Sequence, residues 1–319
     1  MRTAPDAQAP APLDLEESRA GLLGSLGGAD DITLIRSHGN IGDHLIHAGM
    51  RRLLRGLDYR EIGLQHLHGV RGKLAVVTGG GAWCGPHQNL PRYLPLIEGQ
   101  FERVVVFPSS FDTRVRSVRE ALAASRALFF AREHVSFEQI RPLCRAELAH
   151  DTAFFYDFEP YRREGRGTLL AFRTDRESVT NSVPPGNRDI SADCESLDEF
   201  IWTVARHASV QTDRAHVMIA AAMLGKPVRY GPSSYHKLPA LAASSLRGFP
   251  VSPLDGYEFS AAGGDELDAA RGEEAGQAAA PDAETRELLD EFMGSRSFRL
   301  ISAYWRFRRR MRSRGSEGP

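Results

Sequence analysis

The chain contains few cysteines, and the three that it has show no pairing pattern. Cys84, Cys144 and Cys194 lie far apart in the sequence, without any CxxC pair. An odd number of scattered cysteines does not match the disulfide framework of a secreted domain, and zinc sites need closely spaced ligands. The sequence therefore predicts reduced thiols, a cytoplasmic location and no metal site.

Long hydrophobic runs and an excess of one charge are also missing. The most apolar stretch, 217–224, is far shorter than the roughly 20 residues that a membrane-spanning helix needs. The N-terminal residues are rich in Ala, Pro and acidic side chains and lack the apolar core of a signal peptide. Lys and Arg number 40 against 41 Asp and Glu, so we expect no nucleic-acid partner.

The chain is long enough for one large domain or two of ordinary size, since it has 319 residues, of which 42% are hydrophobic and 25% charged. From residue 31 on, short apolar runs alternate with segments of helical spacing. Such an alternation predicts an α/β fold with parallel sheets that are covered on both faces. The strand candidates are DITLIR, KLAVVTGGGAW, RVVVFPSSF, ALFFA, HDTAFFYDF (150–158), GTLLAFRTD, SVQT and KPVRY.

A basic, glycine-containing stretch at 161–167 divides this pattern into two βαβ halves. We therefore predict two Rossmann-like domains with a ligand cleft between them. The predicted organisation is a flexible tail that leads into a short helix (1–29), a first domain (30–160), a second domain (161–258), a disordered linker (259–283) and a C-terminal amphipathic helix (284–315).

The C-terminal helix ends in a basic run, because 299–314 contains seven arginines. A basic helix with aromatic residues can lie on an anionic lipid surface, which would place the protein peripherally on the inner face of the plasma membrane. The alternative is a helix that packs back on the domains with its basic end in solvent. The sequence leaves both readings open.

A cluster of polar residues, Thr212, Asp213, Arg214 and His216, follows one predicted strand and opens a predicted helix. Backbone N–H groups and the helix dipole favour anions at such an N-terminus. An arginine there can hold a carboxylate or phosphate through two hydrogen bonds, and a histidine can donate a proton near neutral pH. The alternative is a capping aspartate beside an exposed arginine and a surface histidine.

Three further segments can contact a ligand. Arg173 ends a predicted strand, where it can bind an anion or pair with Asp175. The loop 39–43 (GNIGD) lacks the GxGxxG and GxxxxGK[ST] nucleotide patterns, so it can contact a sugar or phosphate or form only a tight strand-to-helix turn. The glycine run 79–81 likewise allows close approach of a ligand or of a helix.

Seven segments in order resemble the polysaccharide pyruvyltransferase family, from about residue 38 to residue 237. They are GNIGDHLI, VVTGGGAW, VVVFPSSF, FFAREHVSFE, HDTAFF, RTDRE and VQTDRAHVMIAAAMLGKPV, with SSYHK after the last. The resemblance implies a GT-B-type arrangement of two Rossmann-like domains, phosphoenolpyruvate as donor substrate without a cofactor, and a saccharide or lipid-linked oligosaccharide as acceptor. It also implies a transferase that attaches pyruvate as a ketal in exopolysaccharide or cell-surface glycan biosynthesis.

The resemblance also assigns roles to single residues. It implies that Arg173, Arg214 and His216 lie in a donor site on the second domain, and that GNIGD and the glycine run face the acceptor. The sequence departs from the family at Ser109, where glutamine is usual, and at both neighbours of His216. The catalytic candidates are His216, Arg214 and Asp43, and the substrate-binding candidates are Arg173, Arg214, Gly39, Asn40, Gly42, Gly80, Gly81, Ser109, Arg132, Thr212 and Asp213.

These roles define an expected mechanism. Arg173 and Arg214 neutralise the donor's carboxylate and phosphate, and His216 protonates its methylene carbon as general acid. A sugar hydroxyl adds at C2, phosphate leaves, and a second hydroxyl closes the ketal. Asp43 is the candidate base, unless it only caps a helix. Two alternatives stay open: a GT-B-type glycosyltransferase with a nucleotide-sugar donor, and a non-catalytic protein of polysaccharide assembly.

Overall fold

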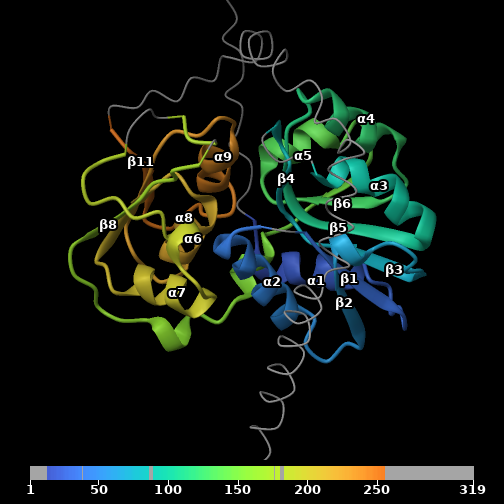
Figure 1. Ribbon diagram of the computed structural model, residues 1–319, viewed down its shortest axis with the longest axis horizontal. Coiled ribbons are helices and arrows are strands. Elements are labelled where there is room, and N and C mark those ends of the chain that lie inside the picture. Colours follow the sequence, from blue (N-terminus) through green and yellow to red (C-terminus); the bar gives the residue numbers. More distant parts are fainter. Residues whose placement is uncertain (1–12, 38, 86–88, 176, 180–182, 256–319) are drawn as a thin grey trace, which may run out of the picture. The chain divides into compact units, whose positions relative to one another are not determined.

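The computed structural model describes residues 13–37, 39–85, 89–175, 177–179 and 183–255. All of them belong to one compact unit, Met1–Ala261, which contains two β-sheets (Figure 1). The predicted linker 259–283 and basic helix 284–315 lie outside the described residues, so both stay predictions. None of the helices described combines the length and the hydropathy of a membrane-spanning segment.

The first sheet has seven strands, and all of its strand pairs are parallel. Both of its faces are buried. On the central strand β3, Leu74 and Val76 enter one apolar core and Ala75 and Val77 the other, because side chains alternate along a strand. The strands are β1 (Ile32–Arg36), β2 (Tyr59–Gly63), β3 (Gly72–Val77), β4 (Gly80–Trp83), β5 (Phe101–Phe111), β6 (Leu128–Ala131) and β7 (Arg145–Leu148).

Helices cover this sheet, and the first of them begins earlier than the predicted domain. Asp14 caps α1, since its Oδ1 accepts a hydrogen bond from the backbone N–H of Glu17 at 2.8 Å, and Leu22 and Leu26 are buried in the core. The short helix expected at the end of the tail therefore belongs to the fold. The helices are α1 (Leu15–Gly24), α2 (Ile41–Leu53), α3 (Asn89–Gln100), α4 (Arg116–Ala124) and α5 (His134–Ile140), with the 3-10 turns η1 (Leu64–His66), η3 (Thr152–Phe155) and η4 (Glu159–Tyr161).

The predicted strand at 150–158 is wrong. The strand of this region is β7, which ends at Leu148, and η3 follows it. Asp151 caps η3 by accepting a hydrogen bond from the backbone N–H of Ala153 at 2.8 Å. The turn sends Phe154 into the core of the second sheet and Phe155 into that of the first. A short apolar run can form either structure, because periodicity alone does not separate them.

The second sheet has four parallel strands in the order β11-β10-β9-β8. Its core is built around α8, in which every residue from Ala215 to Ala222 is buried. The strands are β8 (Thr168–Ala171), β9 (Ser209–Thr212), β10 (Val228–Tyr230) and β11 (Val251–Pro253), and the helices are α6 (Ile190–Asp193), α7 (Leu197–Ala205), α8 (Ala215–Met223) and α9 (Lys237–Ala243).

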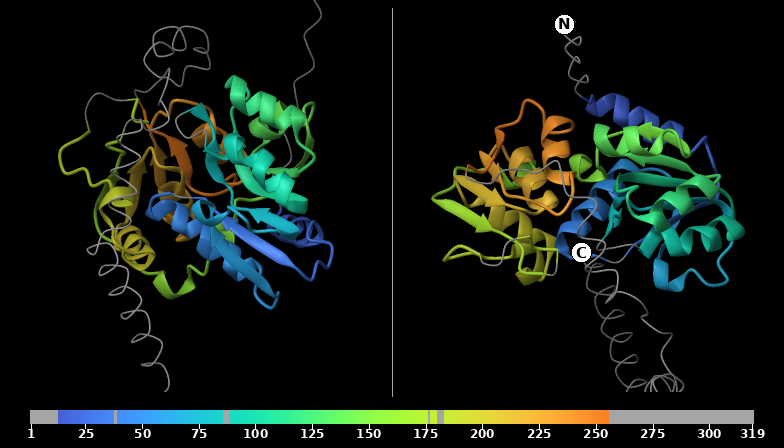
Figure 2. Two further views of the ribbon diagram at one scale, coloured as in Figure 1. Left: turned by 45° about the vertical axis from the view of Figure 1, so that its right-hand side comes forward. Right: turned by 90° about the horizontal axis from the view of Figure 1, so that it is seen from above.

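Helix α2 belongs to both cores. Its residue Leu45 lies in the core of the second sheet, whereas Met50 and Leu53 lie in that of the first, and the helix contacts α7 and α8 (Figures 1 and 2). The prediction of an α/β fold with parallel sheets is thus confirmed. The division into two domains of GT-B type stays a prediction.

The strand order of the first sheet marks a position for ligands. The chain passes from β1 to β2 on one side and then to β3 on the other side of β1. Ligands of open α/β sheets bind outside the carboxyl ends of the strands, where the order reverses in this way. In this chain that position is occupied by residues that follow β1 and β3, namely Ser37, Gly39 and Asn40 after β1 and Thr78 and Gly79 after β3.

Candidate active site

A cavity of about 490 Å³ lies at the carboxyl ends of strands from both sheets. Ser37 and Gly79 follow β1 and β3, and Arg173 and Arg214 follow β8 and β9. The cavity therefore occupies the position that the strand order indicates. The sequence-predicted site residues that line it are Gly39, Asn40, Asp43, Gly81, Arg132, Arg173, Arg214 and His216.

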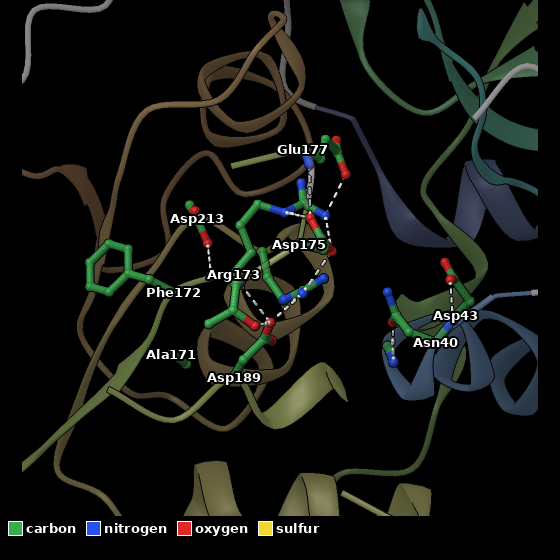
Figure 3. Close-up of polar contacts among 12 residues, drawn as sticks. Asn40, Asp43, Ala171, Phe172, Arg173, Asp175, Glu177, Asp189 and Asp213 are labelled. Atoms are coloured by element: carbon green, nitrogen blue, oxygen red, sulfur yellow. Dashed lines mark hydrogen bonds and ion pairs between the residues drawn. The ribbon is translucent and has the colours of Figure 1, made fainter. Parts of the chain in front are cut away.

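The GNIGD loop forms the N-terminus of α2. Asn40 Oδ1 accepts a hydrogen bond from the backbone N–H of Gly42 at 2.8 Å, and Asp43 Oδ2 accepts one from that of Asn40 at 2.9 Å (Figure 3). A side chain at Gly39 would overlap the Asp43 carboxylate. Asp43 therefore caps the helix, as one reading of the sequence held. Its other oxygen, Oδ1, lies 3.6 Å from Nδ1 of His216, so capping does not exclude a role in the site.

Arg173 follows β8 and lies against two carboxylates. Its Nε is 2.9 Å from Asp175 Oδ1, and its Nη2 pairs with Glu177 (Figure 3). Its backbone N–H donates to Asp213 Oδ1 at 2.8 Å. The pairing with Asp175 is thus confirmed, and Arg173 also lines the cavity, while its role in binding an anion stays a prediction. The two carboxylates fix the orientation of its guanidinium group.

Arg214 is the N-cap residue of α8. Its Nη2 lies 2.9 Å from Asp175 Oδ2 and 2.5 Å from Asp189 Oδ2. Burial lowers the pKa of Arg214, but the hydrogen bond and charge of Asp189, together with the charge of Asp175, outweigh it and raise the pKa overall. The guanidinium therefore keeps its positive charge inside the protein.

Lys237, the first residue of α9, adds a further cation to the same wall. Its Nζ donates a hydrogen bond to Glu177 Oε1 at 2.5 Å, and the other oxygen of Glu177 pairs with Arg173. Burial lowers the pKa of Lys237, and the charge of Glu177 opposes this effect. A single carboxylate thus bridges two buried cations.

His216 lies in the first turn of α8 between two carboxylates. Its Nδ1 is 3.6 Å from Asp43 Oδ1, and its Nε2 is 3.7 Å from Asp151 Oδ2. The N-terminus of α2 comes very close, since a Cβ atom at Gly42 would lie 3.1 Å from Cβ of His216. A side chain at position 42 would therefore crowd His216, so the close approach of the two helices favours glycine there.

The remaining predicted residues do not line the cavity. Two of them support the arginines, because Thr212 Oγ1 accepts a hydrogen bond from the backbone N–H of Arg214 at 3.0 Å and Asp213 holds Arg173 as described. The hydroxyl of Ser109 donates to a backbone carbonyl at 2.9 Å. The residues placed off the cavity wall are Gly42, Gly80, Ser109, Thr212 and Asp213, and their substrate-binding roles stay predictions.

The sequence interpretation named Asp175 as a possible partner of Arg173, but it missed Lys237 and the other acidic residues that hold the cations, Asp151, Glu177 and Asp189. Several of them lie inside the segments that carry the family resemblance: Asp175 and Glu177 in RTDRE, Asp151 in HDTAFF and Lys237 in SSYHK. Asp189 stands in a polar loop, and no motif in the sequence marks it as a partner of Arg214. Only the fold shows that these residues meet, since they come from four separate segments of the chain.

No group of three or more His, Cys, Asp or Glu side chains suitable for a metal ion occurs among the residues that the structure describes. The site instead presents cations and one histidine at the strand ends of a parallel α/β fold. Such a cavity is typical of an enzyme that acts on an anionic substrate.

The chain belongs to the polysaccharide pyruvyl transferase family, whose model matches residues 40–230. The matched region begins at the cap of α2 and ends with β10, so it contains both arginines, His216 and Asp151. The protein is therefore a transferase of polysaccharide biosynthesis.

Comparison with solved structures supports the fold. A functionally uncharacterized protein from Klebsiella pneumoniae subsp. pneumoniae superimposes with a TM-score of 0.60. The two sequences are 22% identical, and the match covers 72% of this chain and 93% of the other. At this identity the likeness concerns the fold alone. No curated protein matches the chain.

Proposed function

We propose that this protein transfers the enolpyruvyl group of phosphoenolpyruvate to a saccharide and closes it as a pyruvate ketal. The observation that supports this proposal best is the arrangement of Arg173, Arg214, Lys237 and His216 on one cavity wall. A small donor that carries both a carboxylate and a phosphate needs several cations and one proton donor within a few ångströms.

The cations of the cavity suit such a donor. Its wall carries Arg132, Arg173, Arg214 and Lys237, and each of them is paired with a carboxylate of Asp151, Asp175, Glu177 or Asp189. The cations are buried and held by these carboxylates, so N–H groups that remain free meet a bound anion in fixed positions and with little screening by water.

The arginines are held in place and still have donors to offer. Among the described residues, Arg173 contacts carboxylates through Nε and Nη2, and Arg214 through Nη2 alone. Nη1 of each arginine is therefore open to a substrate oxygen. Guanidinium groups fixed from one side in this way bind an anion without a large loss of side-chain entropy.

His216 acts as the general acid of the proposed reaction. It gives a proton to the methylene carbon, so that C2 becomes electrophilic, and the first sugar hydroxyl adds there while Asp43 takes its proton. The second hydroxyl then displaces phosphate from C2, and its proton leaves with the phosphate. The proton accepted by Asp43 can return to His216, whose Nδ1 lies 3.6 Å away, which restores the starting state.

On this proposal the acceptor binds next to the first sheet. The part of the cavity wall that comes from the first sheet and from the loops and helices that join its strands is mostly uncharged and includes Ser37, Asn40, Gln65 and Tyr93. Hydroxyl, amide and aromatic groups match a saccharide, which offers hydroxyl groups and apolar C–H faces. A lipid-linked acceptor, a cytoplasmic location and membrane contact through 284–315 are part of the same proposal, and that helix lies outside the described residues.

Thermal unfolding tests the donor. Phosphoenolpyruvate should raise the Tm of the protein, whereas nucleotide sugars should not, because a ligand stabilises only the state that it binds. The variant Arg173→Met should lose this protection, and Arg188→Met, whose side chain pairs with Glu199 away from the cavity, should keep it. Protection by nucleotide sugars but not by phosphoenolpyruvate would instead favour a glycosyltransferase.

A further inference from the structure

A buried ion pair stands directly behind His216. Asp151 is 0% exposed, and its Oδ2 accepts a hydrogen bond from Arg132 Nη1 at 2.8 Å. Its Oδ1 accepts the backbone N–H of Ala153 at 2.8 Å. Arg132 is itself buried and donates from Nε to Ser110 Oγ at 2.8 Å. The carboxylate therefore has a fixed position, set by one side chain and one backbone group.

Asp151 stays ionised in this environment. Burial raises the pKa of its carboxyl group, but the nearby His216 and the charge of Arg132 outweigh burial and hold the pKa well below its usual range. A carboxylate that is fixed, charged and shielded from water acts strongly on a neighbouring ring.

The neighbouring ring is that of His216. Its Nε2 is buried, lies 3.7 Å from Asp151 Oδ2 and forms no hydrogen bond within the described residues. An unpartnered buried ring nitrogen is costly, and here it is aimed at a carboxylate. The opposite edge of the ring carries Nδ1, which lies beside Asp43 on the cavity wall.

We propose that Asp151 is a positioning residue for His216. It keeps the proton of the neutral ring on Nε2 and compensates the charge of the imidazolium ion, so that Nδ1 exchanges protons with the substrate. Arg132 then serves to hold Asp151, which explains why a fully buried arginine lies at the edge of the cavity. This inference rests on the proposed role of His216 as proton donor.

The first test requires no substitution at Asp151. The ¹⁵N NMR spectrum of the histidine-labelled protein reports which nitrogen of each neutral ring carries the proton, and loss of one signal set in His216→Asn identifies this ring. We expect the Nε2–H tautomer. A neutral His216 protonated on Nδ1 overturns the proposal, and this readout does not depend on the identity of the donor substrate.

The second test compares two buried aspartates. In Asp151→Asn the Nε2–H fraction of His216 should fall, and kcat should drop at least about tenfold with little change in KM for phosphoenolpyruvate, because general acid catalysis contributes about 10²–10⁴-fold. The matched control is Asp112→Asn, since Asp112 is also buried and also paired with an arginine, Arg114, but does not line the cavity.

The outcomes separate the possible roles. A folded Asp151→Asn variant with an unchanged tautomer and unchanged kcat shows that Asp151 only supports Arg132 and the cap of η3, and this overturns the proposal. If the variant does not fold, the tautomer of the wild-type ring decides. If phosphoenolpyruvate is no substrate while the Nε2–H tautomer is found and is lost in Asp151→Asn, the proposed function fails and the positioning role stands.

Discussion

Replacing Gly42 with alanine should weaken catalysis while leaving the fold intact. A Cβ atom at this position would lie 3.0 Å from Asn40 Oδ1, 3.1 Å from His216 Cβ and 3.2 Å from His216 Nδ1. Unstrained contacts between carbon atoms are about 3.5–4.0 Å long. The added methyl group therefore displaces His216 by a few tenths of an ångström, away from Asp43.

The expected magnitudes differ for stability and activity. Alanine is favoured over glycine by up to about 1 kcal/mol inside a helix, whereas overpacking costs about 1–3 kcal/mol, so unfolding should become easier by no more than about 3 kcal/mol. A misplacement of about 1 Å can cost about 10²-fold in rate. A displacement of half that size corresponds to roughly a tenfold loss of kcat.

Steady-state kinetics and urea unfolding of the same preparations check this prediction. The matched control is Gly21→Ala on α1, where a Cβ atom meets nothing within 4 Å and where alanine should stabilise the helix slightly. Wild-type kcat in Gly42→Ala would refute the claim that the packing of α2 against α8 sets the position of His216. A similar loss of kcat in both variants would do the same.

Three further predictions concern the site and its support. Lys237→Met should raise KM for phosphoenolpyruvate, because it removes one cation of the cavity wall, whereas Lys237→Arg should keep much of the affinity. Equal KM values in the wild-type protein and both variants would exclude a contact between Lys237 and the donor. Gly79→Ala should fail to accumulate as folded protein, since its Cβ atom would overlap the backbone carbonyl of Pro108; a normal melting curve would contradict this. Burial lowers the pKa of His47 and of His150 to about 4 each, so the unfolded chain binds protons before the folded one as the pH falls below about 6.5. The free energy of unfolding should thus fall on the order of 2 kcal/mol per histidine between pH 7 and pH 5, and urea titrations that show no change between these pH values would contradict the burial of neutral rings.

The sequence was a good guide to the sheets because both faces of a parallel strand are buried. Runs such as LAVV contain apolar residues without interruption, which is the composition of a short strand inside two covering layers. The run at 150–158 was misread for the same reason. Its phenylalanines are apolar because the turn η3 inserts them into two different cores, which a linear pattern does not distinguish from a strand.

The candidate site was only partly predictable. Arg173, Arg214 and His216 were found because they follow strands, and strand ends of parallel sheets share one edge. Of their acidic partners only Asp175 was named from the sequence, because pairing depends on distance in space. Asp189 reaches Arg214 across 25 residues of sequence. Asp151, which follows a strand of the first sheet, lies beside His216, which follows a strand of the second sheet. No local sequence pattern predicts this contact.

Which contacts each polar side chain of the cavity makes also became clear only from the structure. Sequence reasoning treated Asp43 as either a base or a helix cap, and Arg173 as either a ligand contact or an ion-pair partner. In both cases the structural description holds and leaves room for the functional one, because a carboxylate has two oxygens and a guanidinium group has several N–H donors. Alternatives that exclude each other in a sequence motif need not do so in space.

The central claim is that His216 and the surrounding cations transfer pyruvate to a surface glycan. It is tested most directly by mass spectrometry of the glycan from cells that lack this gene and carry either the wild-type protein, His216→Asn or Arg188→Met. We predict the pyruvyl mass increment with the wild-type protein and Arg188→Met, and its loss with His216→Asn expressed at the same level. A glycan that keeps its pyruvyl groups with His216→Asn, or that never carries them, would contradict the account.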